Sequence, residues 1–264
     1  MELESILLIA LGAFAMATMY STVGHGGGSG YLAILAIAAV APEQMRPTAL
    51  LLNVVVASIA TWKFAGQGKF RKDIFFPLVC ASVPAAFIGG AFALPPQLYK
   101  PIVGIILLFA AVRLCTPIKG SEKTKTTSIF AIAVAGICIG FVSGAIGIGG
   151  GIFLSPLVLL LGWTTAKQTA AISAPFILLN SLAGLGGITL ELGGLPINAS
   201  LVAPLIVAVV IGGYIGATFG SKKLGHVGLR TALGIVLLLA AAKMLVTSTS
   251  TESQESLNEI KYRQ

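Results

Sequence analysis

The sequence V-G-H-G-G-G-S-G at residues 23–30 is the feature around which this chain is organised, because it returns as I-G-I-G-G-G at residues 146–151. Each copy follows a long apolar run and precedes a short one, at residues 31–41 and 152–162. Clustered glycines weaken a helix because glycine loses the most backbone entropy on folding. Two such breaks at matching places in the two halves of a membrane protein indicate the binding site of a secondary transporter.

Composition places the chain in a membrane. Hydrophobic residues make up 56% of the sequence, charged residues make up only 10%, and the mean hydropathy is +0.96. Soluble globular domains are far more polar, so we expect a polytopic α-helical protein in contact with the lipid bilayer. The net charge of +8 does not indicate a nucleic-acid partner, because the basic residues lie in short loops, where they set the topology.

Eight apolar runs are long enough to cross or nearly cross a bilayer. A helix needs about 20 residues to cross the hydrocarbon layer, so the runs 31–41 and 152–162 are too short and are expected to be half-helices. Irregular backbone at that depth is tolerated only where protein buries it or water reaches it. The eight long runs are 5–22, 47–65, 74–93, 101–116, 128–143, 168–188, 200–219 and 228–247.

Basic loops predict the orientation. The loops 66–73, 116–128 and 221–230 each carry three lysines or arginines, so we place them in the cytoplasm. The segments 5–41 and 128–162 then each begin and end on one side of the membrane, the first outside and the second inside. Each segment is therefore expected to be a re-entrant helical hairpin with a glycine cluster at its turn, and both chain termini are expected to be external.

The repeat extends beyond the glycines. Asn53 ends the sequence L-L-L-N as Asn180 ends I-L-L-N, and residues 104–113 match 234–243 almost position for position. We therefore expect an all-α integral membrane protein of two inverted repeats, each a glycine-tipped re-entrant helical hairpin plus three transmembrane helices. Such a repeat offers two exchangeable conformations, the usual basis of alternating access. The expected boundaries are 1–115 for the first repeat, 116–127 for a cytoplasmic linker, 128–247 for the second repeat and 248–264 for a disordered polar tail.

The glycine clusters are expected to bind a small anion. The first N–H groups of each half-helix point into the cavity, and the positive end of the helix dipole attracts negative charge. None of the nine acidic residues lies in the middle of an apolar run, whereas a cation carrier keeps a carboxylate inside the membrane. Close helix packing is the alternative, and it accounts well for glycines outside the clusters, such as Gly89 and Gly216. The expected substrate-binding residues are Gly26, Gly27, Gly28, Ser29, Asn53, Gly149, Gly150, Gly151, Ile152 and Asn180.

Three polar side chains leave two interpretations open. His25 is either a neutral histidine packed in the turn or a substrate donor and proton acceptor for coupling, since histidine titrates near physiological pH. Asn53 and Asn180 either join helices through hydrogen bonds or contact the glycine clusters or the substrate. We favour contact with the clusters or the substrate for both asparagines.

Motifs for catalysis are missing from the sequence. There is no H-E-x-x-H, no paired intramembrane aspartate and no P-loop. The sequence G-G-S-G at residues 27–30 superficially resembles an intramembrane serine protease loop, which needs a histidine base on a neighbouring helix. His25 lies in the same cluster and His226 in a basic loop, so we expect a protein that is not an enzyme, with no catalytic residue, no cofactor and no metal. An anion channel of the same architecture and a non-transporting membrane scaffold or assembly protein stay open as alternatives.

The duplicated glycine clusters, with P-T-A-L-L-L-N at residues 47–53 and A-I-S-A-P at residues 171–175, resemble the TauE/SafE sulfite exporter family. The resemblance covers residues 5–247. It implies a transporter of small sulfur-containing anions, sulfite or an organosulfonate such as sulfoacetate, in the bacterial cytoplasmic membrane, and it implies a homodimer. The direction of transport, the coupling ion and the choice of substrate do not follow from the sequence.

Overall fold

The computed structural model describes residues 3–64, 70–92, 94–116, 124–220, 237–239 and 241–246. Throughout these ranges the regular secondary structure is α-helical, as predicted. The helices are α1 (Leu3–Ser21), α2 (Gly28–Ile37), α3 (Pro42–Phe64), α4 (Lys72–Ala91), α5 (Pro96–Cys115), α6 (Ile129–Ile146), α7 (Gly151–Leu160), α8 (Ala166–Leu192) and α9 (Ala199–Gly220).

Six of these helices are long and apolar enough to cross a membrane, namely α1, α3, α4, α6, α8 and α9. Helices α2 and α7 have 10 residues each, about half of what a crossing needs. The expected crossing at 101–116 falls on α5, whose described stretch Gln97–Val112 counts among the shorter apolar helices rather than among the six. Most of the expected helix 228–247 and of the linker 116–127, and all of the tail 248–264, lie outside the described residues.

Several helix boundaries differ from those predicted, and α3 and α8 show the physical reasons. Helix α3 begins at Pro42 rather than near residue 47, so that Pro47 lies inside it; membrane helices tolerate proline because neighbouring groups satisfy the carbonyl that it leaves unpaired. Helix α8 begins earlier than predicted because Thr165 and Gln168 form a capping box at its start. It continues to Gly193, whose φ of 66° ends it.

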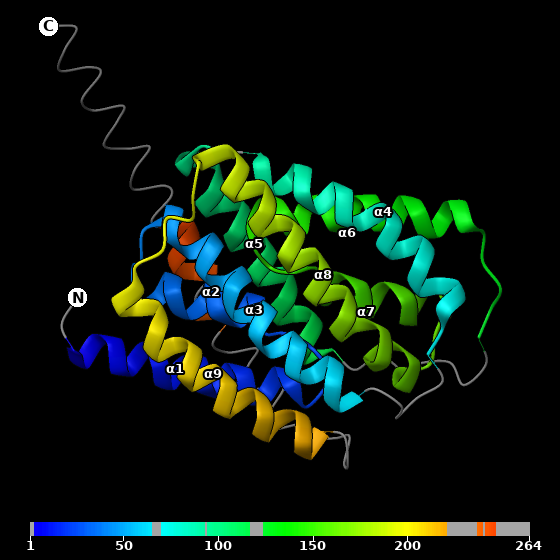
Figure 1. The fold of residues 1–264 in the computed structure, drawn as a ribbon, viewed down its shortest axis with the longest axis horizontal. Helices are drawn as coiled ribbons and strands as arrows, with labels where there is room; N and C mark the ends of the chain where they lie inside the picture. The colour runs from blue at the N-terminus through cyan, green and yellow to red at the C-terminus, as the bar shows by residue number, and fades with distance from the viewer. Residues whose placement is uncertain are drawn as a thin grey trace, which may run out of the picture.

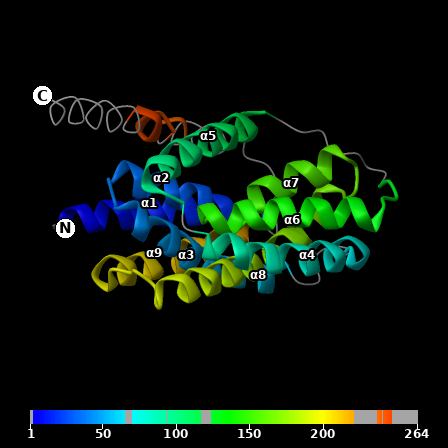
Figure 2. The ribbon, with the colours of Figure 1, turned by 90° about the horizontal axis from the view of Figure 1, so that it is seen from above.

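The long helices pack in pairs that join distant parts of the chain. Helix α1 lies along α9, and α4 lies along both α6 and α8 (Figure 1). Helix α3 packs against α8 and α9 and so joins these pairs. Figure 2 shows α5 and α7 toward one side of the molecule, with α4, α8 and α9 toward the opposite side.

Glycines let these pairs approach closely. Gly216 of α9 packs on the Thr18 carbonyl of α1, and Gly144 of α6 packs on the Ala86 carbonyl of α4, so that a Cβ at either glycine would collide with backbone. Small residues stabilise helix pairs in lipid because they bring backbones into van der Waals contact. Gly89, Gly144 and Gly216 therefore serve helix packing, as the sequence predicted for Gly89 and Gly216.

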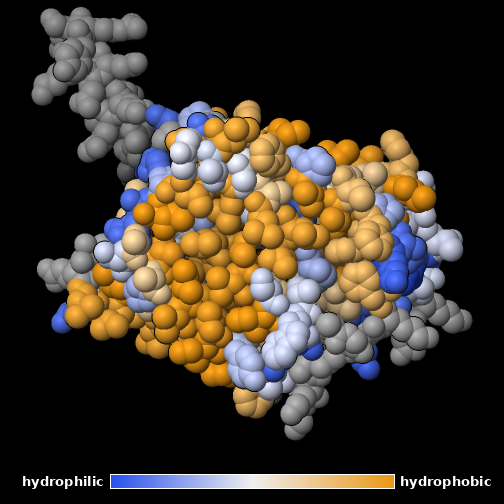
Figure 3. Space-filling model, viewed as in Figure 1, coloured by the Kyte–Doolittle hydropathy of each residue, from blue (hydrophilic) through white to orange (hydrophobic). Residues whose placement is uncertain are grey.

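The outer surface of the helices is apolar. Large hydrophobic side chains point outward from every long helix; Leu8, Phe130 and Phe219 are each at least 70% exposed. Figure 3 shows apolar residues across the middle of one face, with hydrophilic residues toward its two ends. Exposed apolar surface of this extent is typical of contact with lipid, which agrees with the six candidate spans.

Candidate functional site: two glycine tips

The first glycine tip, residues 22–27, joins α1 to α2. Gly27 is the residue before α2 and has φ = 97°, a left-handed conformation that side chains other than glycine rarely adopt. No side chain caps this helix start. The first N–H groups of a helix have no acceptor within it, so α2 begins with backbone donors that are buried at Gly28 and Ser29.

The second glycine tip, residues 147–150, joins α6 to α7 in the same way. Gly150 precedes α7 with φ = 81°, and again no side chain caps the helix start. Gly151 and Ile152 are buried at the first turn of α7. Two buried half-helices therefore each present uncapped N–H groups and the positive end of a helix dipole at a glycine tip.

The structure brings the two tips together. Gly28 at the start of α2 packs on the backbone carbonyl of Ile148 in the second tip, where a Cβ would overlap that carbonyl. Gly151 at the start of α7 lies beside the first tip, since a Cβ there would lie 3.3 Å from Cδ2 of His25. The two helix starts thus lie next to each other although they are far apart in the sequence.

Asn53 of α3 lies against both tips. Its Nδ2 donates to the Ile148 carbonyl oxygen at 2.8 Å, and its Oδ1 is buried without a hydrogen-bond partner. A Cβ on Gly26 would lie 2.6 Å from that Oδ1. Ser181 of α8 lies beside Asn53 at the second tip, because a Cβ on Gly149 would lie 2.7 Å from Asn53 Nδ2 and 2.8 Å from Ser181 Oγ, which also lacks a partner. Polar groups with unused hydrogen-bonding capacity therefore surround the tips.

Asn180 takes a different position from its sequence counterpart. Its Nδ2 donates to the Ser82 hydroxyl of α4 at 3.0 Å and to the Phe176 carbonyl of its own helix at 2.8 Å. The bond to Ser82 joins α8 to α4, which fits the interhelical interpretation. The contact with a glycine tip that we favoured for both asparagines is thus found for Asn53, while the bonds of Asn180 go to Ser82 and Phe176.

Two hydroxyl contacts tie the first tip to its surroundings. His25 Nε2 lies 2.8 Å from Ser155 Oγ of α7, and that oxygen lies 3.1 Å from Ser173 Oγ of α8. The Ser29 hydroxyl hydrogen-bonds the Tyr20 hydroxyl at 2.7 Å, so Ser29 offers the site its backbone N–H rather than its side chain.

Arg46 was not predicted from the sequence to contribute to the site. This side chain of α3 donates from Nε to the Gly144 carbonyl at 3.1 Å, and its two terminal nitrogens donate to the carbonyls of Phe92 (3.3 Å), Gly89 (2.9 Å) and Gly90. It thus binds carbonyls near the C-terminal ends of α4 and α6, where the dipole favours a cation. The signal was present as a lone arginine seven residues before Asn53, but starting the helix at residue 47 left Arg46 in a loop.

Tyr99 of α5 was also not predicted to contribute to the site, and it is another donor to the backbone before the second tip. Its hydroxyl donates to the Ile146 carbonyl at 3.1 Å. The alternate carbonyls of Gly144, Ile146 and Ile148 therefore accept from Arg46, Tyr99 and Asn53 respectively. Three donors from the first half of the chain fix the backbone that leads into the second tip.

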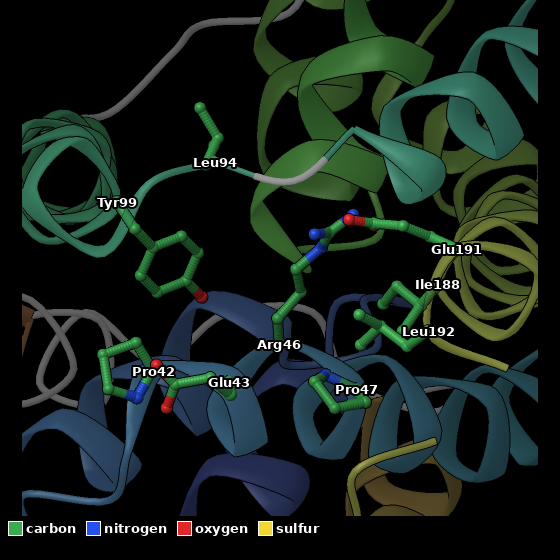
Figure 4. Close-up of a pocket in the computed structure, with 9 residues that line it drawn as sticks. All are labelled: Pro42, Glu43, Arg46, Pro47, Leu94, Tyr99, Ile188, Glu191 and Leu192. Atoms are coloured by element: carbon green, nitrogen blue, oxygen red, sulfur yellow. The ribbon is translucent and has the colours of Figure 1, made fainter. Parts of the chain in front are cut away.

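A cavity of about 170 Å³ lies beside this series of bonds. Arg46 and Tyr99 line it together with the carboxylates of Glu43 and Glu191, which stand at the start of α3 and the end of α8. Figure 4 shows the Glu191 carboxylate and the Arg46 guanidinium pointing toward each other. Side chains of opposite charge thus line this cavity. Among the described residues, no group of three or more His, Cys, Asp or Glu could hold a metal ion.

Comparison with known proteins finds a family model and related proteins that match this chain. The family model described as "Sulfite exporter TauE/SafE" matches residues 8–244. A "Probable membrane transporter protein y4hK" from Sinorhizobium fredii (strain NBRC 101917 / NGR234) is 37% identical over 250 residues, which cover 93% of this chain and 100% of that protein. A "Probable membrane transporter protein" from Haemophilus influenzae (strain ATCC 51907 / DSM 11121 / KW20 / Rd) is 26% identical over 216 residues, 76% of this chain and 80% of the relative. No solved structure matches the chain.

Proposed function

Because the chain belongs to the TauE/SafE sulfite exporter family, we propose that it is a secondary membrane transporter of small sulfur-containing anions, sulfite or an organosulfonate such as sulfoacetate. The observation that carries this proposal is the meeting of two buried, uncapped helix starts at the glycine tips. Backbone N–H groups and the positive ends of two helix dipoles favour an oxyanion. The relatives from Sinorhizobium fredii and Haemophilus influenzae, both described as probable membrane transporters, support transport as the activity.

In this proposal the anion is held by backbone. The N–H groups of residues 26–29 and 149–152 donate to its oxygens. Asn53 orients the second tip through Ile148 and faces the anion with its amide, and the Ser181 hydroxyl adds a donor. Asn180 supports the site from a distance by holding α8 against α4.

Alternating access is the mechanism that we propose. The segments α1–tip–α2 and α6–tip–α7 form the hairpins of two inverted repeats, 1–115 and 128–247, in the bacterial cytoplasmic membrane with both termini external. The α1–α9 and α4–α6 pairs each join a hairpin helix to a helix of the other repeat. Rocking of one such unit against the other would expose the tips first to one side and then to the other.

The test is anion-dependent thermal stabilisation of the purified protein in detergent at fixed pH. The panel holds sulfite, sulfate, thiosulfate, sulfoacetate, taurine, phosphate and chloride. A ligand that binds only the folded protein raises its melting temperature with concentration. We expect stabilisation by sulfite or sulfoacetate, and we expect it to be lost in Asn53→Ala, which removes the contact between α3 and the second tip.

Asn180→Ala is the matched control for this variant. It removes the same side chain from a site whose bonds go to Ser82 and Phe176, so it should lower the melting temperature while the response to the anion persists. A flat response of the unmodified chain to every anion would contradict the proposal. Flux into vesicles then separates the alternatives, because a scaffold gives no flux, and a channel gives flux without acceleration by anion on the opposite side.

A further inference from the structure

The His25 imidazole lies in a chain of hydrogen bonds that crosses from the first tip into the second half of the protein. Its Nδ1 lies 3.1 Å from the Val23 carbonyl oxygen. On the other side of the ring, Nε2 is bonded to Ser155, and Ser155 is bonded to Ser173. Ser155 and Ser173 are 7% and 0% exposed, so the chain runs through the protein interior.

The partners of the ring define its neutral form. A carbonyl oxygen only accepts, so Nδ1 carries a hydrogen and donates it to Val23. In the neutral ring Nε2 then accepts from the Ser155 hydroxyl, and Ser155 accepts from Ser173. When Nε2 gains a proton, it donates to Ser155, which in turn donates to Ser173. Each hydroxyl can rotate to serve as donor or acceptor, so both protonation states fit the same heavy-atom positions.

The location of the ring links its charge to anion binding. His25 lies beside Gly151, the first residue of α7, and an imidazolium there faces the positive end of the α7 dipole. An anion at the tips would offset that repulsion. A favourable interaction between two bound species is reciprocal, so each raises the affinity for the other.

We propose that His25 is a proton-binding site and that the protein carries a proton together with its anion. The inference rests on the proposed function and adds the coupling ion to it. Protonation through Ser155 and Ser173 prepares the tips for the anion, and release of the proton from Nε2 on the opposite side of the membrane, after the change of conformation, favours anion release there.

Hydroxyl side chains on α8 give the proton a direction of approach. Thr165, Thr169 and Ser173 follow each other at intervals of four residues and therefore share a face of the helix. At the start of α8, Thr169 Oγ1 bonds Thr164 Oγ1 at 2.8 Å, and the neighbouring Trp163 carbonyl accepts from Arg71 at 3.2 Å. The series thus begins near Arg71, whose basic loop we expect in the cytoplasm.

The other titratable groups around the first tip lie farther along their helices or are phenols. Ser155 of α7 bonds the ring and Ser173 of α8 bonds Ser155, while Tyr20 and Tyr31 are the phenols of α1 and α2. Helices α2 and α7 carry no charged residue. The charged residues of α1, α3 and α8 lie within two turns of a helix end and are Glu4, Glu43, Arg46, Lys63, Lys167 and Glu191.

The chain contains two histidines, which makes a direct test feasible. In His226→Gln, His25 is the remaining imidazole, and nuclear magnetic resonance of histidine-labelled protein in detergent reports its protonated fraction. We expect the protonated fraction of the ring to rise as the pH falls. At fixed pH, saturating sulfite or sulfoacetate should raise the ratio of protonated to neutral ring by about tenfold, within the usual range for coupled sites.

A second measurement follows the anion instead of the proton. Thermal stabilisation by sulfoacetate, whose acidic groups stay ionised above about pH 5.5, should grow as the pH falls in the unmodified chain. It should become independent of pH in His25→Gln. Ser58→Ala is the control, because the Ser58 hydroxyl bonds the Val54 carbonyl of its own helix on the exposed side of α3, and it should keep the pH dependence.

The outcomes separate this inference from the proposed function. Stabilisation by sulfite or sulfoacetate with an unchanged protonated fraction of His25 would overturn proton coupling while leaving anion transport in place. A ring that does not titrate would overturn it as well. A flat response to every anion would contradict the proposed function itself, and coupling would fall with it.

Discussion

The two glycine tips share a backbone design but are held by different side chains. Each ends in a left-handed glycine before a 10-residue helix without a side-chain cap. The second tip is held from outside, because Arg46, Tyr99 and Asn53 donate to the alternate carbonyls that lead into it. The first tip instead contacts a neighbouring helix through its own side chain, since His25 bonds Ser155 of α7. One tip is thus fixed by permanent donors, and the other carries a group whose charge can change.

The residues seven positions before the two matched asparagines also differ between the two halves of the chain. The residue seven positions before Asn53 is Arg46, and the residue seven positions before Asn180 is Ser173. Arg46 bonds the backbone before the second tip, whereas Ser173 bonds Ser155 and so reaches His25. Backbone geometry therefore recurs in the two halves, while the side chains around it differ, and the difference places the titratable group on one tip only.

The largest expected effect comes from the contact between the tips. Gly28→Ala puts a Cβ into the Ile148 carbonyl, and backbone cannot move away without displacing the second tip, so we expect anion flux in vesicles to fall to background. Gly151→Ala at the matched position meets the end of the flexible Ile177 side chain instead, so the loss should be only about tenfold or less. Gly194→Ala, which meets nothing within 4 Å, should be silent; equal loss at Gly28 and Gly151 would contradict the comparison.

A smaller effect is expected where the second tip is held. Arg46→Lys keeps the charge but loses the planar fork that bonds several carbonyls, so the free energy of unfolding should fall by about 3 kcal/mol. Thermal or denaturant unfolding in detergent measures the change. Lys63→Gln on the same helix is the control, since Lys63 lies over the Tyr214 ring at 4.1 Å and its loss should cost less than about 1 kcal/mol. A cost at Arg46 no larger than at Lys63 would show that the arginine does not hold the tip.

The smallest effect is expected at Tyr99. Tyr99→Phe removes one hydroxyl and leaves the Ile146 carbonyl unpaired, and single hydrogen bonds in membrane proteins contribute about 0.6 kcal/mol. The unfolding free energy should therefore fall by roughly that amount, and flux should change by less than about threefold. Loss of flux comparable to that in Gly28→Ala would mean that the hydroxyl contacts the substrate rather than the tip.

Much of the fold and part of the candidate site could be predicted from the sequence. Apolar runs predicted the helices because lipid requires long apolar segments, and the glycine clusters predicted the breaks because three glycines destabilise a helix. The family membership followed from the same motifs and is confirmed by the family model over residues 8–244. Asn53 was also predicted to lie against a tip, and the structure places it there.

Other features could not be predicted, because they depend on which helices lie side by side. Nothing local distinguishes Asn53 from Asn180, yet one bonds a tip and the other bonds Ser82. Arg46 looked like a loop residue until α3 was found to begin at Pro42. Ser155 resembles any small residue of an apolar helix, and only the packing of α7 on the first tip brings it to His25.

The sequence by itself determined the chemistry that the chain can offer: apolar helices, two glycine breaks, one histidine in a break and no carboxylate in mid-span. Those properties are local, since they depend on residue type and spacing along the chain. The tertiary structure alone decided which backbone donors meet, which tip is held by Arg46 and which is joined to Ser155. Side-chain hydrogen bonds reach about 3 Å, so their partners are set by helix packing between residues about a hundred positions apart.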